Sequence, residues 1–137
     1  MAGKVQFELV SPERLLFSEP VDMVVVPGSE GDFGALPQHA PMLTSMRPGV
    51  IDVYEAGVVT NRIFVAGGFA EVTEEGLTVL AEEAIPVADI DPQSISTRLK
   101  AAERAIEEAD SDRARAEAER SLAVAKAFEA AAEGAAV

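Results

Sequence analysis

The stretch GSEGDFGALPQHAPML, from Gly28 to Leu43, holds three glycines, two prolines and the only histidine of the chain. Glycine adopts positive φ without strain and proline fixes φ at about −65°, so a segment rich in both is typical of one defined loop shape. Its Gly-x-x-Gly-x-x-Gly spacing is not the dinucleotide-binding fingerprint, and the Gly-Lys-Ser/Thr ending of a phosphate-binding loop is missing. The stretch therefore predicts a tight structural loop between strands.

The chain on both sides of this stretch alternates apolar and polar residues, as strands with one buried face do. The apolar positions are Val5, Phe7 and Leu9; Val21, Met23 and Val25; Ile51 and Val53; and Leu77, Val79 and Ala81. Turns are expected at Glu55 to Gly57, Gly67-Gly68 and Glu74 to Gly76. Several short strands at this spacing indicate a β-sandwich or barrel.

The composition changes near Asp91. All eight prolines and nine of the ten glycines lie at or before residue 92, and residues 93–133 contain neither. Asp91 can cap a helix that starts at Pro92, and apolar residues then recur every three or four positions as far as Ala109. Asp110-Ser111-Asp112 interrupts this pattern before a second helix. The sequence thus predicts two parts, an acidic β domain (1–90) and a helical hairpin (91–137).

The predicted contact between the two helices consists mostly of alanines. Ala102, Ala109, Ala118 and Ala125 lie on the facing sides. Small side chains let helices approach closely but bury little apolar area, and at about 25 cal/mol per Å² they contribute little stability. We therefore expect a hairpin that detaches easily, with fraying in its last residues, AAAEGAAV (130–137).

The composition excludes several classes of partner. The net charge is −13, and residues 1–92 carry 15 acidic and 4 basic side chains, a net charge of −11. Such a surface disfavours nucleic acid and anionic lipid and favours a basic protein. The chain has no cysteine and no apolar stretch near the roughly 18 residues of a membrane span, so neither disulfides nor membrane insertion is expected.

No combination of residues predicts catalysis or metal binding. His39 lacks the nucleophile and the further ligands that a catalytic triad or a zinc site needs. Glu82 and Glu83 are adjacent on a predicted strand, so their side chains point to opposite faces and are expected to be solvated. The sequence therefore predicts a protein that is not an enzyme.

The stretch from Gly28 to Leu43 resembles the signature of the epsilon chain of F-type ATP synthases, in which Ser-Glu-Gly precedes Gly-x-x-Pro-x-His-Ala-Pro-Leu-Leu. The likeness continues in SPERLLFSEPVDMVVVPGSEG, MLTSMRPGVIDV and FVAGGFAEVTEEGLTVLAEEA, and covers roughly residues 5–90. The resemblance implies a mixed, mainly β fold: an N-terminal β-sandwich of about ten short strands followed by a C-terminal antiparallel α-helical hairpin.

The same resemblance implies a function. Members of the family are non-catalytic rotor subunits of the central stalk, bound to the gamma chain and seated on the c-ring, and they couple proton flow to ATP synthesis. It implies a peripheral location on the cytoplasmic face of the bacterial plasma membrane, and a hairpin that can reach the alpha and beta chains and modulate hydrolysis. The residues it assigns to docking are Glu30, Asp32, His39 and Pro41.

Nucleotide binding is not expected. Family members that bind ATP have Ile/Leu-Asp-x-x-Arg-Ala at the start of the first helix and arginines on the second. This chain keeps Ile90 and Asp91 but has Ser94 and Ile95 at the Arg-Ala positions, and Leu122 and Lys126 match the second-helix arginines. Without the arginine there is no bidentate grip on a phosphate, and no cofactor is predicted.

Three alternatives to the stalk subunit remain at this point. A stand-alone small-ligand-binding β-sandwich with a dimerising hairpin would form a homodimer and contain a deep apolar pocket. A small acidic hydrolase would need convergent titratable groups. The organellar counterpart of the same subunit is disfavoured because MAGKVQFELV lacks the features of a presequence.

Overall fold

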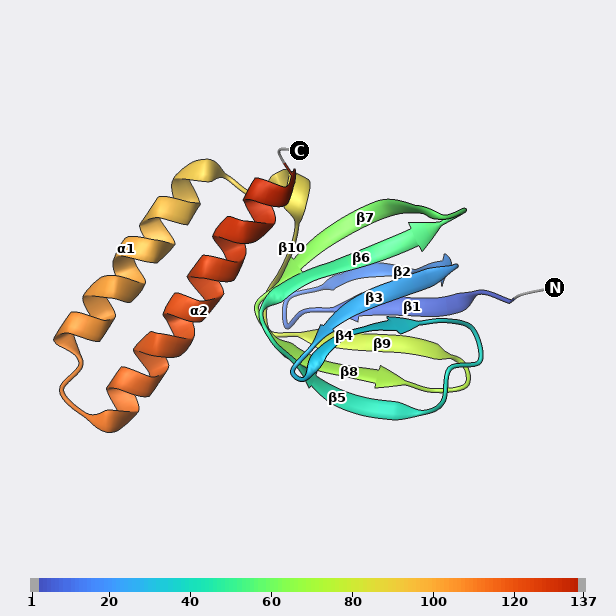
Figure 1. The fold of residues 1–137 in the computed structure, drawn as a ribbon, viewed down its shortest axis with the longest axis horizontal. Helices are drawn as coiled ribbons and strands as arrows, with labels where there is room; N and C mark the ends of the chain where they lie inside the picture. Colours follow the sequence, from blue (N-terminus) through green and yellow to red (C-terminus); the bar gives the residue numbers. More distant parts are fainter. Residues whose placement is uncertain (1–2, 136–137) are drawn as a thin grey trace.

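The computed structural model describes residues 3–135, which form a β-sandwich and a projecting pair of helices (Figure 1). Within these residues there are ten strands, one short 3-10 helix and two α-helices. The strands are β1 (Val5–Val10), β2 (Leu15–Val21), β3 (Met23–Gly28), β4 (Gly31–Ala35), β5 (Met42–Met46), β6 (Gly49–Glu55), β7 (Val58–Val65), β8 (Gly68–Val72), β9 (Gly76–Ala81) and β10 (Ala84–Pro86). The helices are η1 (Val87–Asp89), α1 (Pro92–Glu108) and α2 (Asp112–Ala135). The predicted fold class is confirmed.

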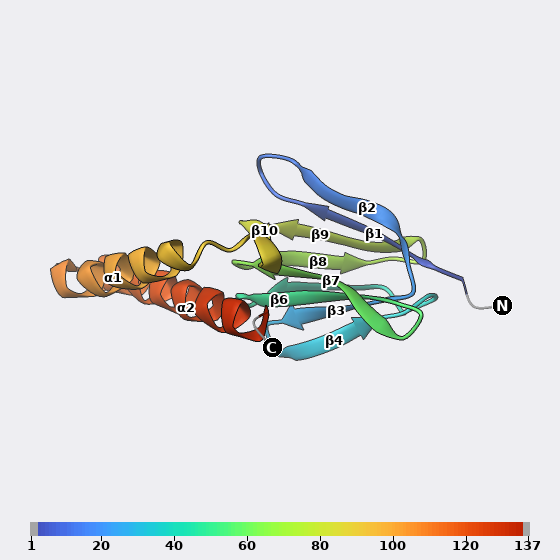
Figure 2. The same cartoon turned by 90° about the horizontal axis from the view of Figure 1, so that it is seen from above.

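The strands form one continuous sheet folded into two layers. Their order is β10-β7-β6-β3-β5-β8-β9-β1-β2, and β4 pairs with β3 outside this path. Figure 2 shows β2, β1, β9 and β8 in one layer and β7, β6, β3 and β4 in the other. The layers are joined where β3 meets β5, through the pair Gly28 and Met46. Neighbours are antiparallel except β1 and β9, which are parallel.

The main core fills the space between the layers. Most of the predicted apolar alternations point into it: Val5, Phe7, Leu9, Ile51, Val53, Leu77, Val79 and Ala81 are all buried. The polar residues between them face solvent or the rim. The period of two therefore identified the buried face of β1, β6 and β9 correctly.

The alternation predicted for Val21, Met23 and Val25 is wrong beyond its first residue. Val21 is buried at the end of β2, but Val24 and Val26, rather than Met23 and Val25, enter the core from β3. The chain turns at Asp22, between the two strands, and its backbone N–H donates to the Tyr54 carbonyl. The turn restarts the alternation, so every side chain after it lies on the other face.

The stretch from Gly28 to Leu43 is not one loop, contrary to the sequence-based prediction. It contains the end of β3, a two-residue turn, the whole of β4, a six-residue connection and the start of β5. Strand β4 forms because its residues pair with β3 from Val24 to Gly28, and Ala35 fills a buried position in the core. The glycines set the turn and the prolines set the later connection, with a strand between them.

The expected turns and helix caps are present. Ala56 and Gly57, with φ of 53° and 80°, connect β6 to β7, and the other two turns also lie between strands. At the first helix the Asp91 carboxylate accepts the Gln93 N–H at 3.0 Å, with Pro92 as the first helical residue. The second helix begins after Ser111, whose hydroxyl oxygen accepts the Ala114 N–H.

The hairpin packs on the sandwich through a second core at its base. Phe64, Ala66 and Val87 from the β part meet Phe128 and Ala131 of α2. The prediction of a weakly held hairpin considered only the alanine contact between the helices and missed this interface. The fraying was expected over residues 130–137; as far as the described residues go, α2 continues to Ala135 and Ala131 is buried in this core, whereas residues 136 and 137 lie outside them.

Candidate partner-docking site

The structure does not bring the four predicted docking residues together. Glu30 lies in the turn between β3 and β4, and His39 and Pro41 lie in the connection between β4 and β5. These segments are at opposite ends of β4, which spans about 14 Å at about 3.4 Å per residue. In Figure 1 the Glu30 turn is at the end of the sandwich that faces the helices, and the other connection is at the far end. The predicted site is therefore two surfaces.

Arg47 holds the Glu30 turn in place. Its Nη1 donates to the Gly28 carbonyl at 2.5 Å and its Nη2 forms an ion pair with Asp32. Its backbone N–H also donates to the Pro27 carbonyl, and Ser29 donates its N–H to the Ser45 carbonyl. The Asp32 carboxylate is thus paired with a residue of the same chain. Glu30 is exposed and is the carboxylate that the turn presents to a partner.

His39 has a local structural role. Its Nδ1 lies 2.7 Å from the Ala40 carbonyl oxygen, and its ring centroid is 6.5 Å from that of Phe33. The neighbouring Gln38 has φ of 64°, which is unusual for a residue other than glycine. These contacts define the path of the connection, and Pro41 is exposed at its end.

The outer face of the β5-β8-β9-β1-β2 layer carries a row of exposed apolar side chains. Phe69 pairs with Leu80, Leu80 with Val10, and Val10 with Leu15, so all four side chains lie on one face in adjacent strands. Leu43 lies on the same face of β5, opposite Glu71. Phe69, Leu80, Leu15 and Leu43 are each more than half exposed. We call the five residues Leu43, Phe69, Leu80, Val10 and Leu15 the outer apolar row.

Sequence reasoning missed the outer apolar row. Its signal was present, because β9 (GLTVLA) has apolar residues at both parities and Leu80 falls between two core positions. Adjacent apolar patches of this kind on a surface mark contact sites more often than isolated side chains do. The patch can be recognised only when the pairing of the five strands is known, and this pairing cannot be read from the sequence.

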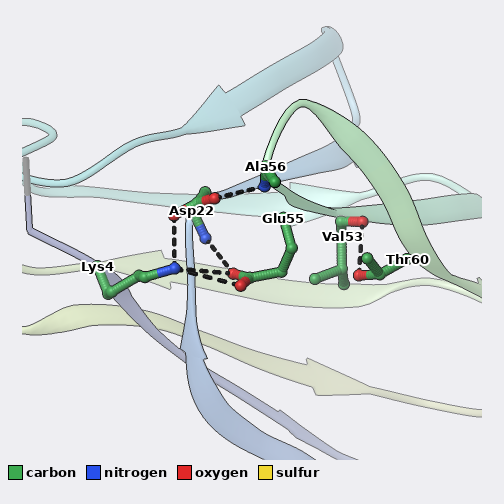
Figure 3. A network of polar contacts seen from close by, with 6 residues as sticks. All are labelled: Lys4, Asp22, Val53, Glu55, Ala56 and Thr60. Atoms are coloured by element: carbon green, nitrogen blue, oxygen red, sulfur yellow. Dashed lines mark hydrogen bonds and ion pairs between the residues drawn. The ribbon is translucent and has the colours of Figure 1, made fainter.

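Ion pairs and hydrogen bonds connect three segments at the end of the sandwich that lies away from the helices (Figure 3). Lys4 Nζ lies 2.7 Å from Asp22 Oδ1 and 3.2 Å from Glu55 Oε2, and Asp22 Oδ2 accepts the Ala56 N–H at 2.7 Å. The hydrogen bonds to Asp22 and then Glu55 raise the pKa of Lys4, and those from Lys4 and then Ala56 lower the pKa of Asp22. The network ties β1 to the β2–β3 bend and the β6–β7 turn.

The residues that remain of the nucleotide motif have structural roles. Asp91 caps α1, and its carbonyl also accepts the Ser94 hydroxyl at 2.6 Å. Ile90 packs against the second core. In the part of the chain that the structure describes, no cluster of three His, Cys, Asp or Glu residues could hold a metal ion.

A groove of about 940 Å³ opens between the hairpin and the sandwich. Phe69 and Met46 line it on the sandwich side, and Arg120 and Val124 on α2. The groove is continuous with the outer apolar row through Phe69. The sandwich interior is filled by the main core, and the groove lies outside it, between the sandwich and the helices.

Comparisons with known proteins agree with this architecture. The family "ATP synthase, Delta/Epsilon chain, beta-sandwich domain" matches residues 4–87. The ATP synthase epsilon chain of Paramagnetospirillum magneticum is 60% identical over 131 residues, covering 96% of this chain and 98% of that one. That of Rhodospirillum rubrum is 58% identical over 134 residues, covering 98% and 100%.

Two solved structures share the fold. A chain of the mitochondrial ATP synthase of Euglena gracilis superposes with a TM-score of 0.79 at 26% identity, covering 96% of this chain and 82% of that chain. A chain from the central stalk and c-ring of the Tetrahymena thermophila enzyme gives a TM-score of 0.71 at 13% identity, covering 95% and 98%. At that identity the second likeness concerns the fold alone.

Proposed function

Because this chain belongs to the ATP synthase epsilon-chain family, we propose that it is the non-catalytic central-stalk subunit of a proton-translocating F-type ATP synthase. The observation that carries this proposal is the 60% identity to an epsilon chain over 96% of the sequence, strands and helices alike. Its role is to transmit rotation between the membrane-embedded ring and the stalk. The protein therefore acts through the surfaces it presents to its neighbours.

The outer apolar row and the adjoining groove are the surface that we assign to the gamma chain. Four side chains more than half exposed on one sheet face suit a partner that buries them permanently. The net charge of −11 over residues 1–92 favours a partner surface with basic residues around the apolar contact. We assign His39 and Pro41 to a second, separate docking contact. They lie in the connection between β4 and β5, at the end of the sandwich away from the helices.

The Glu30 turn is the surface that we assign to the polar loops of the c-ring. It is exposed, it is held by Arg47, and its carboxylate can pair with a basic loop. A turn fixed in this way loses little conformational freedom on docking. Asp32 supports the geometry of the turn through its ion pair with Arg47.

Charge reversal at Glu30 tests this assignment. Glu30→Lys should lower proton-driven ATP synthesis in membranes and leave the stability of the chain within about 0.5 kcal/mol, because the side chain is exposed. The matched control is Glu74→Lys, which makes the same charge change in the β8–β9 turn. Normal synthesis with Glu30→Lys would refute the contact, and equal losses in both variants would show a general charge effect.

The division into a β domain (1–90) and a regulatory hairpin (91–137) is also a proposal. Strand β10 ends at Pro86 and α1 begins at Pro92, and the main core contains only residues of the β part, whereas the second core joins the β part to α2. A chain that ends after Asp91 should keep the main core, bind gamma and support synthesis, with the change confined to hydrolysis. Failure of that chain to bind gamma would show that the hairpin is needed for assembly.

The location follows from the assembly. The chain is part of a membrane-associated enzyme, and we propose that it lies on the cytoplasmic face of the bacterial plasma membrane, held there by gamma and the c-ring. Neither helix in the described range is both long and apolar enough to span a membrane. Contact of the hairpin with the alpha and beta chains belongs to the same proposal.

A further inference from the structure

One arginine joins three parts of the chain at the base of the hairpin. Arg98, on α1, directs Nη1 to Glu83 Oε1 at 2.9 Å, and its Nη2 forms the second contact of a bidentate ion pair with the same carboxylate. Glu83 lies between β9 and β10 on the sandwich. The Arg98 guanidinium carbon is also 4.3 Å from the centroid of the Phe128 ring on α2. Glu83, which the sequence predicts to be solvated, keeps 40% of its side chain exposed and is also ion-paired with Arg98.

The second core lies directly beneath this arginine. Phe128 is buried and meets Phe64 edge to face, with ring centroids 5.1 Å apart. Val87 of η1 and Ala131 of α2 complete the contact. Beyond the base the helices project from the sandwich (Figure 1). Arg98 and Glu83 also line the groove between the hairpin and the sandwich. The contacts at the base therefore hold the hairpin against the sandwich.

We propose that Arg98 is a latch that sets the equilibrium between a docked hairpin and a released one. The ion pair joins α1 to the sandwich, so release of the hairpin breaks it. The cation–π contact joins α1 to α2 and orients the Arg98 guanidinium towards Glu83 only when Phe128 is in its docked place. The residue does not touch the main core, so opening the latch leaves the sandwich folded.

The chemistry of the contact suits a reversible latch. Arg98 and Glu83 each keep about a third or more of their side chains exposed, at 33% and 40%, so both charges return to water at small cost when the contact opens. A partner that offers a carboxylate to Arg98 or a cation to Glu83 binds only the released state and shifts the equilibrium towards it. The inference concerns the chain alone and can be tested without its assembly.

A buried thiol measures release directly. The chain has no cysteine, so Val87→Cys introduces a single thiol at a position that is 4% exposed under the hairpin. When opening and closing are fast, the rate of thiol modification is proportional to the released population. In this background Arg98→Ala should raise the rate about tenfold, which corresponds to about 1.4 kcal/mol. Glu83→Gln should raise it less, by about threefold, because Arg98 stays over Phe128.

Two controls separate the latch from general effects. Arg113→Ala removes the same charge from an exposed pair with Glu117 on α2 and should leave the rate within about twofold. A Val79→Cys probe in the main core should react at the same rate with and without Arg98→Ala. The proposal is overturned if Arg98→Ala does not accelerate the Val87→Cys probe, if Arg113→Ala accelerates it equally, or if both probes accelerate together.

Discussion

Removing the aromatic ring of Phe128 should undock the hairpin without unfolding the sandwich. The side chain is 1% exposed, its ring centroid is 5.1 Å from that of Phe64, and the Arg98 guanidinium lies over its face at 4.3 Å. Burial of a phenylalanine contributes about 1.5–3 kcal/mol and an edge-to-face pair about 0.5–1.5 kcal/mol, and Phe→Ala changes in cores cost about 3–5 kcal/mol. Phe128→Ala should therefore weaken docking by about 3–5 kcal/mol, or two to four powers of ten.

Two optical signals distinguish the hairpin from the sandwich. The chain has one tyrosine and no tryptophan, and Tyr54 lies on β6, so its fluorescence reports the sandwich. Circular dichroism at about 222 nm is dominated by the two helices. In urea, the Phe128→Ala chain should lose the helical signal at a lower concentration than the tyrosine signal, because an alanine-rich hairpin buries too little area to be stable when undocked.

The matched control is Phe69→Ala, which deletes the same ring from an exposed position on β8. It should change stability by no more than about 0.5 kcal/mol. The reasoning is refuted if the two signals of Phe128→Ala remain coincident and move together, which would place Phe128 in the same cooperative unit as the main core. It is equally refuted if Phe128→Ala unfolds like the unaltered chain.

Three further predictions concern other parts of the molecule. Lys4 and Ala56 lower the pKa of Asp22 below its ordinary 3.8, so this network stabilises the fold above about pH 4 and is lost as the pH falls through the lower folded-state pKa; Asp22→Asn should flatten the acid limb of a stability–pH curve, and an unchanged limb would contradict the network. Gly76→Ala should cost about 1–3 kcal/mol in urea unfolding because its Cβ would lie 2.1 Å from the Gln6 carbonyl oxygen, whereas Gly3→Ala meets open space and should be neutral. Calorimetry should find ATP binding at millimolar strength or weaker, since Ser94 replaces an arginine whose charged hydrogen bonds contribute about 1.5–3 kcal/mol, and micromolar binding would contradict this.

The type of several elements could be predicted because their signals are local. The alternation in β1 and β9, the Asp91-Pro92 start of α1 and the break at Ser111 each depend on residues within a few positions of one another. The backbone groups at helix caps and turns form hydrogen bonds with residues nearby in the chain, so the sequence indicates them directly. The failure at Met23 and Val25 shows the limit, because the bend at Asp22 depends on contacts with the distant Tyr54 and Glu55.

The candidate site could be predicted only in part. Glu30 and His39 were assigned to one loop because they are nine positions apart, but β4 between them pairs with β3 and places them at opposite ends of the strand. The Asp32 carboxylate, which is predicted to dock a partner, also forms an ion pair with Arg47, 15 positions away, and the sequence alone does not show this contact. The outer apolar row depends on the register of five strands, which no short pattern encodes.

The sequence by itself determined the division into a β part and a helical hairpin, the strands that alternate clearly, the starts of the two helices, and, through the Gly28 to Leu43 motif, the family to which the chain belongs. Only the tertiary structure decided which faces meet: Phe128 with Phe64, Arg98 with Glu83, and Lys4 with Glu55, pairs that are 64, 15 and 51 positions apart. The physical reason is that secondary structure arises from interactions a few residues apart, with periods of 3.6 and 2 that can be read directly. Packing between elements depends instead on the shape, register and charge of segments that are far apart in the sequence. The contacts that hold the hairpin could therefore be found only from the arrangement of the folded chain.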